Sequence, residues 1–503
     1  MLKQGICKEG NMKKIILIFP GQFHVNDVNI PLSLLYLSKP LLEHGYDVQI
    51  VDSRIEDYRK IDYQNIMYAG VSTMSGIQIS HGLEVAKFIR KQNPKAKLIW
   101  GGPHPTIIPD DVISSAFADI VVRGEGEETL LKLTKRLEKG ESYDDILGLT
   151  FKKEGKAFST PDSKPIDLNG VGILPYHLLK MERYPNIIDK FEYISSKGCP
   201  HPCTFCSDAA NYGRSWRAKS SETVISELEH IINTYHPKRI TIQDANFFVS
   251  RRRVEEICRA IIDKKWDIDI YAFIRSDYVP RYSDEMMGLI RRAGFKEIAF
   301  GAESGSNRLL EYIKKQQKTD KIIKTVEIFK KHDIKPVISL MIGLPTETNK
   351  ELNQTLDLYN QIMKIHPQAM VNGIFIFTPF PGSELARILV DQYNYHFPGA
   401  LEEWGKWKWS SPKNITWVEK EAKLKYEAIY LIIRFLFVYK LLRNWSFWQL
   451  KARCGSSVKA ISALLFNISF YPFAKIRWTK RLFKYPLEMK LWYMAYCKFK
   501  GVD

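Results

Sequence analysis

The sequence lacks the long apolar runs that secretion or membrane insertion requires. Near the start, the apolar run over residues 15–19 is too short for a secretory signal and stops at Pro20-Gly21. In the last 84 residues, the longest stretch without a charge has 15 residues, from Ala460 to Ala474, and Pro472 interrupts it. A helix that spans a bilayer needs about 20 predominantly apolar residues. We therefore expect neither a secretory signal nor a spanning helix.

Cysteine is also scarce, and its number is odd. The 503 residues include seven cysteines, and three of these, Cys199, Cys203 and Cys206, fall within eight residues. This distribution argues against a disulfide framework and indicates a reducing compartment, so we expect a cytoplasmic protein. With 45% hydrophobic and 26% charged residues the composition is globular, and the chain is too long for one ordinary core. Two or three domains are expected.

The first domain, residues 13–145, alternates short apolar runs with amphipathic helical patterns. The runs are "KKIILIFP", "YDVQIVD", "IMYAGVSTM", "AKLIWGG" and "ADIVVRGEG". This alternation predicts β-α units around a parallel sheet, where ligands bind beyond the carboxyl ends of the strands. One glycine at a strand end is best explained by a tight turn, but several at one edge let a backbone approach a large ligand. The residues at these ends are Gly21, Ser72, Thr73, Gly101, Gly102, Gly124 and Gly126.

The sequence Ser72-Thr73-Met74, followed after 26 residues by Gly101-Gly102, resembles the S-x-L…GG part of the cobalamin-binding Rossmann-like domain. The resemblance implies that these strand-end residues, including Gly21, Gly124 and Gly126, pack around cobalamin. A second motif of that family, D-x-H-x-x-G, supplies a histidine to cobalt. Here His24 lacks both the Asp two residues before it and the Gly three after it. We therefore expect that His24 does not ligate cobalt.

The second domain, residues 191–390, follows a linker over 146–190 and carries the three clustered cysteines. Six strand-like runs separated by helical patterns predict an open barrel of parallel strands, with functional groups at the C-terminal strand ends. Cys199 closes the first run, "KFEYISSKGC". Three thiolates leave one of four metal coordination positions open, which is typical of a catalytic site. A structural zinc site that recruits Cys258 or a distant histidine is the alternative, although Cys258 lies in a helical pattern typical of a buried apolar residue.

The C-x3-C-x2-C loop, with Phe205 just before its last cysteine, resembles that of the radical S-adenosylmethionine (SAM) superfamily. The resemblance implies that Cys199, Cys203 and Cys206 hold three irons of a [4Fe-4S] cluster and that SAM binds the fourth. Reductive cleavage of SAM then gives a 5′-deoxyadenosyl radical. "IQDANFF" and "GAESGS" also match the superfamily by position. The implied SAM-binding residues are Phe205, Gln243, Asp244, Arg275, Glu303 and Ser304, with Glu303 on the ribose and Arg275 on the carboxylate.

The order of the two domains resembles that of the cobalamin-dependent radical SAM enzymes, most of which are methyltransferases. The expected fold is α/β: a Rossmann-like cobalamin-binding-type domain, a partial (β/α)6 radical SAM barrel and a mainly α-helical C-terminal region over 391–503. The resemblance implies methylation of an unactivated carbon with a [4Fe-4S] cluster, SAM and cobalamin, and a reductant such as flavodoxin or ferredoxin. Non-methylating radical chemistry, such as ring formation or oxidative cyclisation, and a cobalamin- or cluster-binding sensor without turnover are the alternatives.

The last 84 residues carry most of the positive charge. From Lys420 onward there are 17 Lys/Arg, 4 Asp/Glu and 19 aromatic residues, so +13 of the net +18 lies here. Basic groups beside Trp and Tyr suit the headgroup layer of an anionic membrane, which predicts peripheral binding at the inner membrane face and a small-molecule or lipid substrate. A helical cap with packed aromatics and solvated Lys/Arg is the alternative. No nucleic-acid-reading motif is present, so nucleic acid is not an expected partner.

Overall fold

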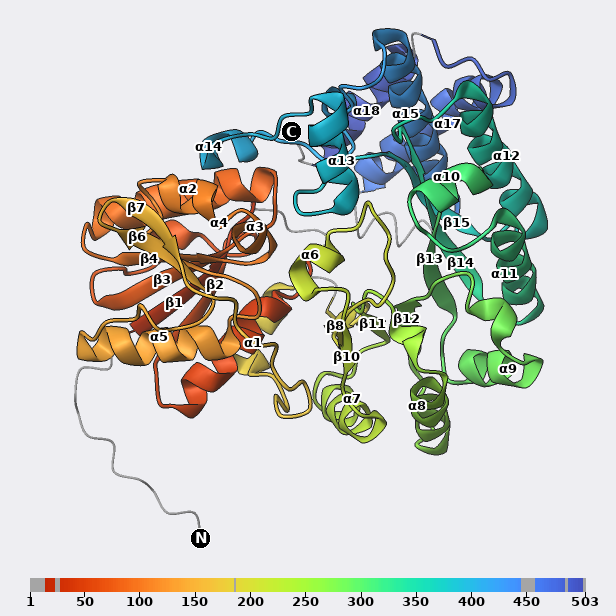
Figure 1. Ribbon diagram of the computed structural model, residues 1–503. Coiled ribbons are helices and arrows are strands. Elements are labelled where there is room, and N and C mark those ends of the chain that lie inside the picture. The colour runs from red at the N-terminus through yellow and green to blue at the C-terminus, as the bar shows by residue number, and fades with distance from the viewer. Residues whose placement is uncertain (1–13, 23–27, 185–186, 445–456, 485–486, 501–503) are drawn as a thin grey trace. The chain divides into compact units, whose positions relative to one another are not determined.

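The computed structural model in Figure 1 describes residues 14–22, 28–184, 187–444, 457–484 and 487–500. Its contacts divide the chain into two compact units. The first unit combines residues 1–187 with the short segment 397–407, and the second combines residues 188–396 with residues 408–503. The chain therefore returns to the first unit after it has completed most of the second.

The first unit is built on a seven-stranded sheet in the order β2-β1-β3-β4-β5-β6-β7. The first five strands are parallel, and β6 and β7 extend the edge as antiparallel strands. In Figure 1, α1 and α5 cover one face and α2 covers the other, which explains why the strands read as continuous apolar runs. The elements are β1 (Lys14–Phe19), α1 (Leu32–Glu43), β2 (Val48–Asp52), β3 (Ile66–Ser72), α2 (Ile77–Gln92), β4 (Lys97–Gly101), α3 (Pro103–Ile107), α4 (Pro109–Ser114), β5 (Ile120–Val122), α5 (Glu127–Lys139), β6 (Leu149–Lys153), β7 (Lys156–Ser159) and, from the returning segment, α14 (Leu401–Trp404).

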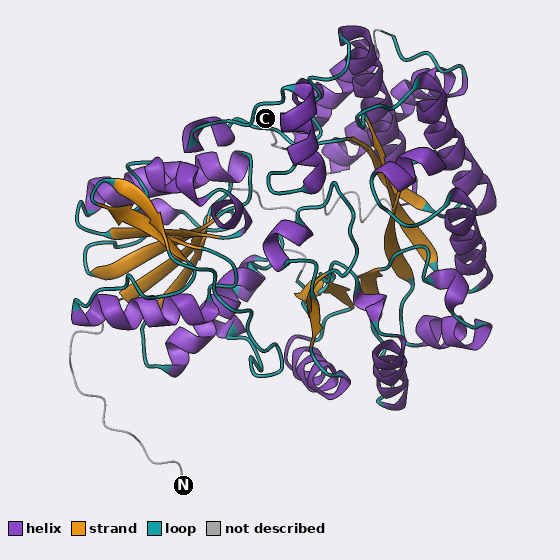
Figure 2. Ribbon diagram, in the orientation of Figure 1, coloured by secondary structure: helices purple, strands orange, loops and turns teal. Residues whose placement is uncertain are grey.

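The second unit is built on six parallel strands in the order β15-β14-β13-β12-β11-β8. Helices follow the strands in turn along the chain, so the predicted β-α alternation is present. Figure 2 shows the helices and strands of the two units in separate colours. The strands are β8 (Phe191–Tyr193), β11 (Arg239–Ile242), β12 (Asp269–Phe273), β13 (Glu297–Glu303), β14 (Lys335–Ile342) and β15 (Met370–Ile376). The helices between and after them are α7 (Ser221–Tyr235), α8 (Arg251–Asp263), α9 (Asp284–Arg292), α10 (Asn307–Tyr312), α11 (Thr319–Lys331), α12 (Asn349–Ile365) and α13 (Glu384–Tyr393).

The run "KFEYISSKGC" does not form one strand, as the sequence suggests. It divides into β8, which belongs to the six-stranded sheet, and β9 (Ser196–Gly198), which pairs with β10 (Trp216–Ala218) in a separate antiparallel ribbon. The short helix α6 (Asp208–Tyr212) lies between β9 and β10 in the chain. The three clustered cysteines therefore belong to the excursion between β9 and β10.

From residue 420 onward, the described part of the chain contains three long helices: α15 (Lys420–Asn444), α17 (Ser457–Thr479) and α18 (Leu487–Lys500). Helix α15 packs against β15, where Lys440 Nζ donates to the carbonyl oxygens of Pro367 (2.7 Å) and Ala369 (2.6 Å). Pro472 lies inside α17. Within the described ranges, none of the helices combines the length and apolar character needed to cross a bilayer.

Candidate active site

Backbone hydrogen bonds at Thr204 fix the middle of the loop that carries the three cysteines. The amide of Thr204 donates to the carbonyl of Ile313 (3.0 Å), and the amide of Leu385 donates to the carbonyl of Thr204 (2.7 Å). Gly198, just before Cys199, has φ +79°, and a Cβ there would collide with the carbonyl oxygen of Ser215. All three thiols are free and partly accessible. The chain thus presents three unpaired sulfurs from one constrained loop.

A buried carboxylate holds the backbone that leads into this loop. Asp244, at the end of β11, accepts hydrogen bonds from the amides and hydroxyls of both Ser195 (2.7 and 2.6 Å) and Ser196 (2.9 and 2.6 Å). Burial raises the pKa of Asp244 and outweighs these four hydrogen bonds, which favour the charged form. Because both of its oxygens are occupied within the loop, Asp244 acts here as an anchor for the start of β9.

A second layer of buried charge lies behind Asp244, and the sequence alone did not point to it. Arg253 donates to the carbonyl oxygens of Lys219 (2.7 Å) and Ser195 (3.1 Å). Lys219 itself pairs with Glu227 at 2.6 Å, and all four charged groups are buried or nearly so. Burying charged groups costs free energy, and the ion pair and hydrogen bonds of this network offset part of that cost while they hold the backbone around β9 in place.

Three of the predicted residues meet around a lysine that the sequence analysis missed. Lys315 Nζ lies 2.9 Å from Glu303 Oε1 and 5.8 Å from the ring centroid of Phe205. Arg275 places Nη1 3.6 Å from Cys203 Sγ and donates through Nη2 to the carbonyl of Lys315. Burial opposes the charge of Lys315, but the Glu303 carboxylate and the Cys203 thiol outweigh it and raise its pKa.

The backbone at Glu303 explains how its carboxylate reaches this lysine. Glu303 has φ +62°, in the left-handed region, and its side chain folds back over Gly301, where a Cβ would collide with Oε1. A non-glycine residue in this conformation stores strain of about 1–3 kcal/mol, which is frequent at functional sites. At the same place, the register of β13 against β14 shifts between Gly301 and Glu303, so the strand has a bulge where its backbone bends.

The remaining predicted SAM contacts have described partners elsewhere. Gln243 donates to Glu192 Oε1 (2.6 Å), and Ser304 Oγ accepts from the amide of Ser306 (3.1 Å) and lies 3.3 Å from Thr355 Oγ1. The structure therefore brings Phe205, Arg275 and Glu303 together beside Cys203, and it places Ser304 against α12.

The donor set of the cysteine loop fits an iron–sulfur cluster. Burial raises the pKa of Cys206 to about 12 and also raises that of Cys199, so metal binding must supply the energy to ionise these thiols. Arg275 and Lys315 provide nearby positive charge for anionic sulfur ligands. Among the described residues, no group of three or more His, Cys, Asp or Glu converges on a single ion, and Cys258 is fully buried in α8. The zinc alternative thus gains no fourth ligand from Cys258.

The first unit gathers most of its predicted residues at one edge of the sheet. Gly102 has φ +98°, and a Cβ there would lie 2.8 Å from the carbonyl oxygen of Thr73 and 3.0 Å from Ser72 Oγ. The amide of Thr73 donates to the carbonyl of Gly101 (2.9 Å). Only glycine at 102 allows the ends of β3 and β4 to come this close. His24 falls outside the described residues.

The other predicted glycines lie at the ends of β1 and β5. The amide of Gly21 donates to Ser53 Oγ (2.8 Å), and that of Gly124 donates to Thr106 Oγ1 (3.0 Å). Gly126 precedes α5, where a Cβ would approach Val122 Cγ1 to 3.0 Å. Just after β3, Met74 and Ile77 are 43% and 61% exposed, so apolar surface is available at this edge.

Two residues that sequence reasoning did not select support the same edge. The amide of His104 donates to the carbonyl of Thr73 (3.2 Å), and its Nδ1 lies 3.0 Å from Ser75 Oγ. The Trp404 ring, from the returning segment, lies 4.8 Å from the His104 ring and donates through Nε1 to Asp111 (2.9 Å). Burial lowers the pKa of His104 to about 4, so the ring is neutral near pH 7. Its position two residues after a glycine pair was a usable signal, whereas Trp404 offered none.

Known protein families match both units of the chain. Residues 193–359 match the radical SAM superfamily, and residues 23–134 match the B12 binding domain. A Pyrococcus horikoshii protein described as an uncharacterized methyltransferase is 31% identical over 385 residues, which cover 74% of this chain and 82% of the relative. An anaerobic magnesium-protoporphyrin IX monomethyl ester cyclase from Synechocystis is 26% identical, with 67% and 70% covered. The hopanoid C-3 methylase of Methylococcus capsulatus is 24% identical, with 74% and 71% covered.

Solved structures share the fold. The cobalamin-dependent SAM radical enzyme OxsB, bound to aqua-cobalamin and SAM, superposes with a TM-score of 0.71 at 17% identity and covers 98% of this chain and 76% of its own. The radical SAM methyltransferase TsrM from Kitasatospora setae superposes with a TM-score of 0.64 at 16% identity and covers 76% of each chain. The predicted order of domains is thereby confirmed: a cobalamin-type Rossmann domain, a radical SAM barrel and a helical C-terminal region.

Proposed function

The chain belongs to the family of cobalamin-dependent radical SAM enzymes, and we propose that it methylates an unactivated carbon of a hydrophobic substrate. The observation that carries this proposal is the joint presence, in one chain, of the three-thiol loop beside Arg275, Glu303 and Lys315 and of the glycine-lined edge of a B12 binding domain. A relative named hopanoid C-3 methylase supports a carbon atom of a hydrophobic molecule as the acceptor of the methyl group.

Each site would contribute its own residues. When bound, the cluster and SAM supply a carbon-centred radical, and cobalamin supplies the methyl group. Cys199, Cys203 and Cys206 would hold the cluster, and Arg275 would bind the SAM carboxylate, which suits a guanidinium. Glu303, oriented by Lys315, would bind the ribose hydroxyls.

The remaining assignments follow the resemblance or the contacts. Phe205, Gln243 and Ser304 remain proposed SAM contacts. For Asp244 we propose a positioning role in place of SAM binding, since both of its oxygens are occupied by Ser195 and Ser196. The residues proposed to surround cobalamin are Gly21, Ser72, Thr73, Gly101, Gly102, Gly124 and Gly126.

The test is anaerobic turnover of the reconstituted protein with a reductant, SAM and extracts of candidate lipids. Methylation predicts 5′-deoxyadenosine together with a product heavier than the substrate by one methylene, and the added methyl should carry label from methyl-labelled SAM. Release of 5′-deoxyadenosine with a product that lacks the label would exclude methyl transfer.

Ring formation is the second candidate, and one observation favours it. Three relatives, each 25–26% identical, are named anaerobic magnesium-protoporphyrin IX monomethyl ester cyclases. A cyclase changes the hydrogen or oxygen content of its substrate without adding carbon. The mass of the product therefore separates the two candidates in the same experiment.

The C-terminal helices support a lipid surface as the source of the substrate. Leu487, Leu491 and Met494 of α18 are 68%, 63% and 68% exposed, and their spacing of four and three residues puts them on one helix face. Phe473 and Ile476 of α17 are more than half exposed as well. In the described part of the chain, seven of the fifteen exposed large apolar side chains lie between residues 468 and 494, which concentrates apolar surface in one region.

Exposed lysines accompany this apolar surface, whereas several of the large aromatic rings are packed inside. Lys475, Lys480 and Lys484 are exposed, while Trp478 and Trp492 are buried. The helical-cap alternative thus accounts for these aromatics, and the aliphatic face with its lysines suits an anionic membrane surface. Co-sedimentation with anionic but not neutral vesicles, weakened by salt and by Leu487→Gln/Leu491→Gln/Met494→Gln, is the expected result. Recovery in the supernatant with both vesicle types would contradict membrane docking.

A further inference from the structure

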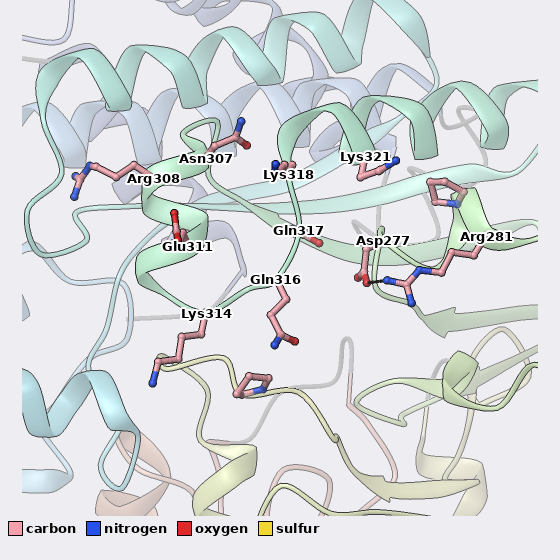
Figure 3. A pocket seen from close by; sticks show the side chains of 12 residues that line it. Asp277, Arg281, Asn307, Arg308, Glu311, Lys314, Gln316, Gln317, Lys318 and Lys321 are labelled. Atoms are coloured by element: carbon pink, nitrogen blue, oxygen red, sulfur yellow. Dashed lines mark hydrogen bonds and ion pairs between the residues drawn. The ribbon is translucent and has the colours of Figure 1, made fainter.

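A pocket of about 940 Å³ opens beside the cysteine loop, and the site described so far does not use it. Figure 3 shows Asp277 and Arg281, which follow β12, on one side of the pocket and Arg308 and Lys314 on the other. Pro202, the residue before Cys203, belongs to the lining. The pocket therefore reaches the loop that holds the three thiols.

The wall shared by the pocket and the cysteine site is the segment 314–318, whose side chains alternate in direction. Lys315 and Gln317 are buried: Lys315 pairs with Glu303, and Gln317 accepts from Ser276 Oγ at 2.7 Å. Lys314, Gln316 and Lys318 are exposed and line the pocket, to which the buried Gln317 also contributes. This short turn-and-coil segment, in which Lys314 and Gln316 have positive φ (+50° and +56°), thus presents an inner face to the proposed SAM contacts and a basic outer face to solvent.

The charge of the pocket is strongly positive. Its lining contains five basic side chains and two acidic ones: Arg281, Arg308, Lys314, Lys318, Lys321, Asp277 and Glu311. Asp277 is already paired with Arg275 (2.9 Å) and Arg281 (3.0 Å). Arg308 and Lys314 are paired with Glu351 and Glu384. Lys318 and Lys321 form no ion pair with the described residues, so they are the groups open to an outside anion.

Two further features mark this place: one adds to its positive potential, and the other joins it to the cysteine loop. Lys318 is the N-cap residue of α11 and Lys321 lies in its first turn, so the positive end of the helix dipole adds to both ammonium groups. His201, next to Pro202, places Nε2 2.6 Å from Tyr278 OH and Nδ1 3.4 Å from Gln316. The pocket wall and the cysteine loop are therefore joined by direct contacts.

We propose that this basic pocket is the docking surface for an acidic one-electron donor protein that reduces the cluster held by Cys199, Cys203 and Cys206. The proposal rests on the proposed function, because reductive cleavage of SAM consumes one electron that must come from outside the chain. In the step itself the donor is oxidised by one electron and the cluster is reduced by one, without transfer of atoms. Acidic side chains of the donor pair with Lys318 and Lys321, while its redox group approaches the loop at Pro202. Complementary charge of this kind mainly accelerates association.

The experiment compares Lys318→Glu/Lys321→Glu with Lys324→Glu/Lys330→Glu in the full chain. Lys324 and Lys330 are exposed on the same helix, so the control makes an equal change in net charge away from the pocket. The rate of 5′-deoxyadenosine formation is measured against the concentration of reduced flavodoxin, and separately with dithionite, a small reductant that needs no docking. Binding of oxidised flavodoxin is measured by calorimetry without turnover.

The pocket variant should require about tenfold more flavodoxin for half-maximal rate at low salt, bind flavodoxin correspondingly more weakly, and keep its dithionite rate. The control variant should behave like the wild type in all three measurements. Unchanged flavodoxin binding and concentration dependence would overturn the proposal, as would an equal loss with dithionite, which is the result expected if the pocket binds a small anionic ligand. If the wild type makes no 5′-deoxyadenosine even with dithionite, the proposed function fails, and the binding measurement still decides whether donor docks here.

Discussion

The two units hold their proposed cofactor sites by different physical means. In the second unit, buried charged groups surround the cysteine loop: Asp244 and Arg253 on one side, Arg275 and Lys315 on the other. In the first unit, the edge is shaped by close backbone approach at Gly102 and by a neutral buried histidine. An anionic cluster with its thiolates calls for fixed positive charge and hydrogen bonds, whereas a large corrinoid calls for shape and apolar surface. Changes of charge should therefore be most harmful in one unit, and changes of volume in the other.

Among the substitutions that test this contrast between the two units, those of Asp244 are expected to have the largest effect. In Asp244→Ala, four donors on Ser195 and Ser196 lose their acceptor, and a buried network of this kind contributes about 3 kcal/mol or more. We expect a marked fall in iron content after reconstitution, with Asp244→Asn intermediate because it keeps one acceptor oxygen. Iron analysis and chemical denaturation measure the two effects. A fully loaded, equally stable Asp244→Ala protein would remove the anchoring role.

A smaller effect is expected at Gly102, where volume is the variable. Gly102→Ala adds a Cβ 2.8 Å from the Thr73 carbonyl at φ +98°, and should cost about 1–3 kcal/mol and lower the amount of cobalamin bound. The matched control is Gly140→Ala, at φ +68° with no atom within 4 Å of the added Cβ. 5′-Deoxyadenosine formation should persist in both. Equal cobalamin content in the two variants would show that the β3–β4 edge is not the binding surface.

A smaller effect, on the pH dependence of stability, is expected from the buried side chain of His104. Its folded pKa, about 4, lies below the ordinary value of 6.5, so the unfolded chain binds more protons between these values. Stability should therefore be complete above about pH 6.5 and fall as the pH drops toward 4, by about 2 kcal/mol between pH 7 and pH 5. Denaturation curves of wild type and His104→Gln at both pH values measure this contribution. The same acid loss in both proteins would contradict a neutral buried His104.

Substitution of His24 is expected to have no effect on bound cobalamin. The sequence around it lacks the Asp and Gly of the cobalt-ligating motif. The visible spectrum of bound cobalamin should be unchanged in His24→Ala, with about one cobalamin per chain. A changed spectrum in this variant would identify His24 as a cobalt ligand.

Local patterns in the amino-acid sequence predicted most of the architecture. Alternating apolar runs and helical patterns located β1 to β5 of the first sheet and the six strands of the second, and the spacing of Cys199, Cys203 and Cys206 located the loop. The strands β6 and β7 were not predicted, since they lie in residues 146–190, which read as a linker. Lys315 was out of reach because "IKKQQK" reads as solvated charge, and only the packing of this segment against Glu303 turns one lysine inward. Trp404 was out of reach because its partner His104 lies 300 residues earlier in the chain.

Two expectations show how tertiary contacts override local patterns. The apolar run before Cys199 reads as one strand, but the chain leaves the sheet after Tyr193, and Asp244 binds Ser195 and Ser196 where the β9–β10 ribbon begins. The aromatic residues of the C-terminal region suggest a membrane interface, yet Trp478 and Trp492 are buried and the exposed apolar residues include Leu487 and Leu491. Asp244 lies 49 residues after Ser195, and Trp478 donates through Nε1 to Asn360, 118 residues earlier, so no window of local sequence contains these partners.

The most direct test of the account replaces all three clustered cysteines by alanine in the full chain. Wild-type and variant proteins are reconstituted with iron, sulfide and hydroxocobalamin, and visible absorbance, bound cobalamin and 5′-deoxyadenosine are measured in the same samples. The wild type should show all three. The variant should keep about one cobalamin per chain but lose the cluster absorbance and all SAM cleavage. A triple-alanine variant that still made 5′-deoxyadenosine would contradict the assignment of Cys199, Cys203 and Cys206 as the cluster ligands.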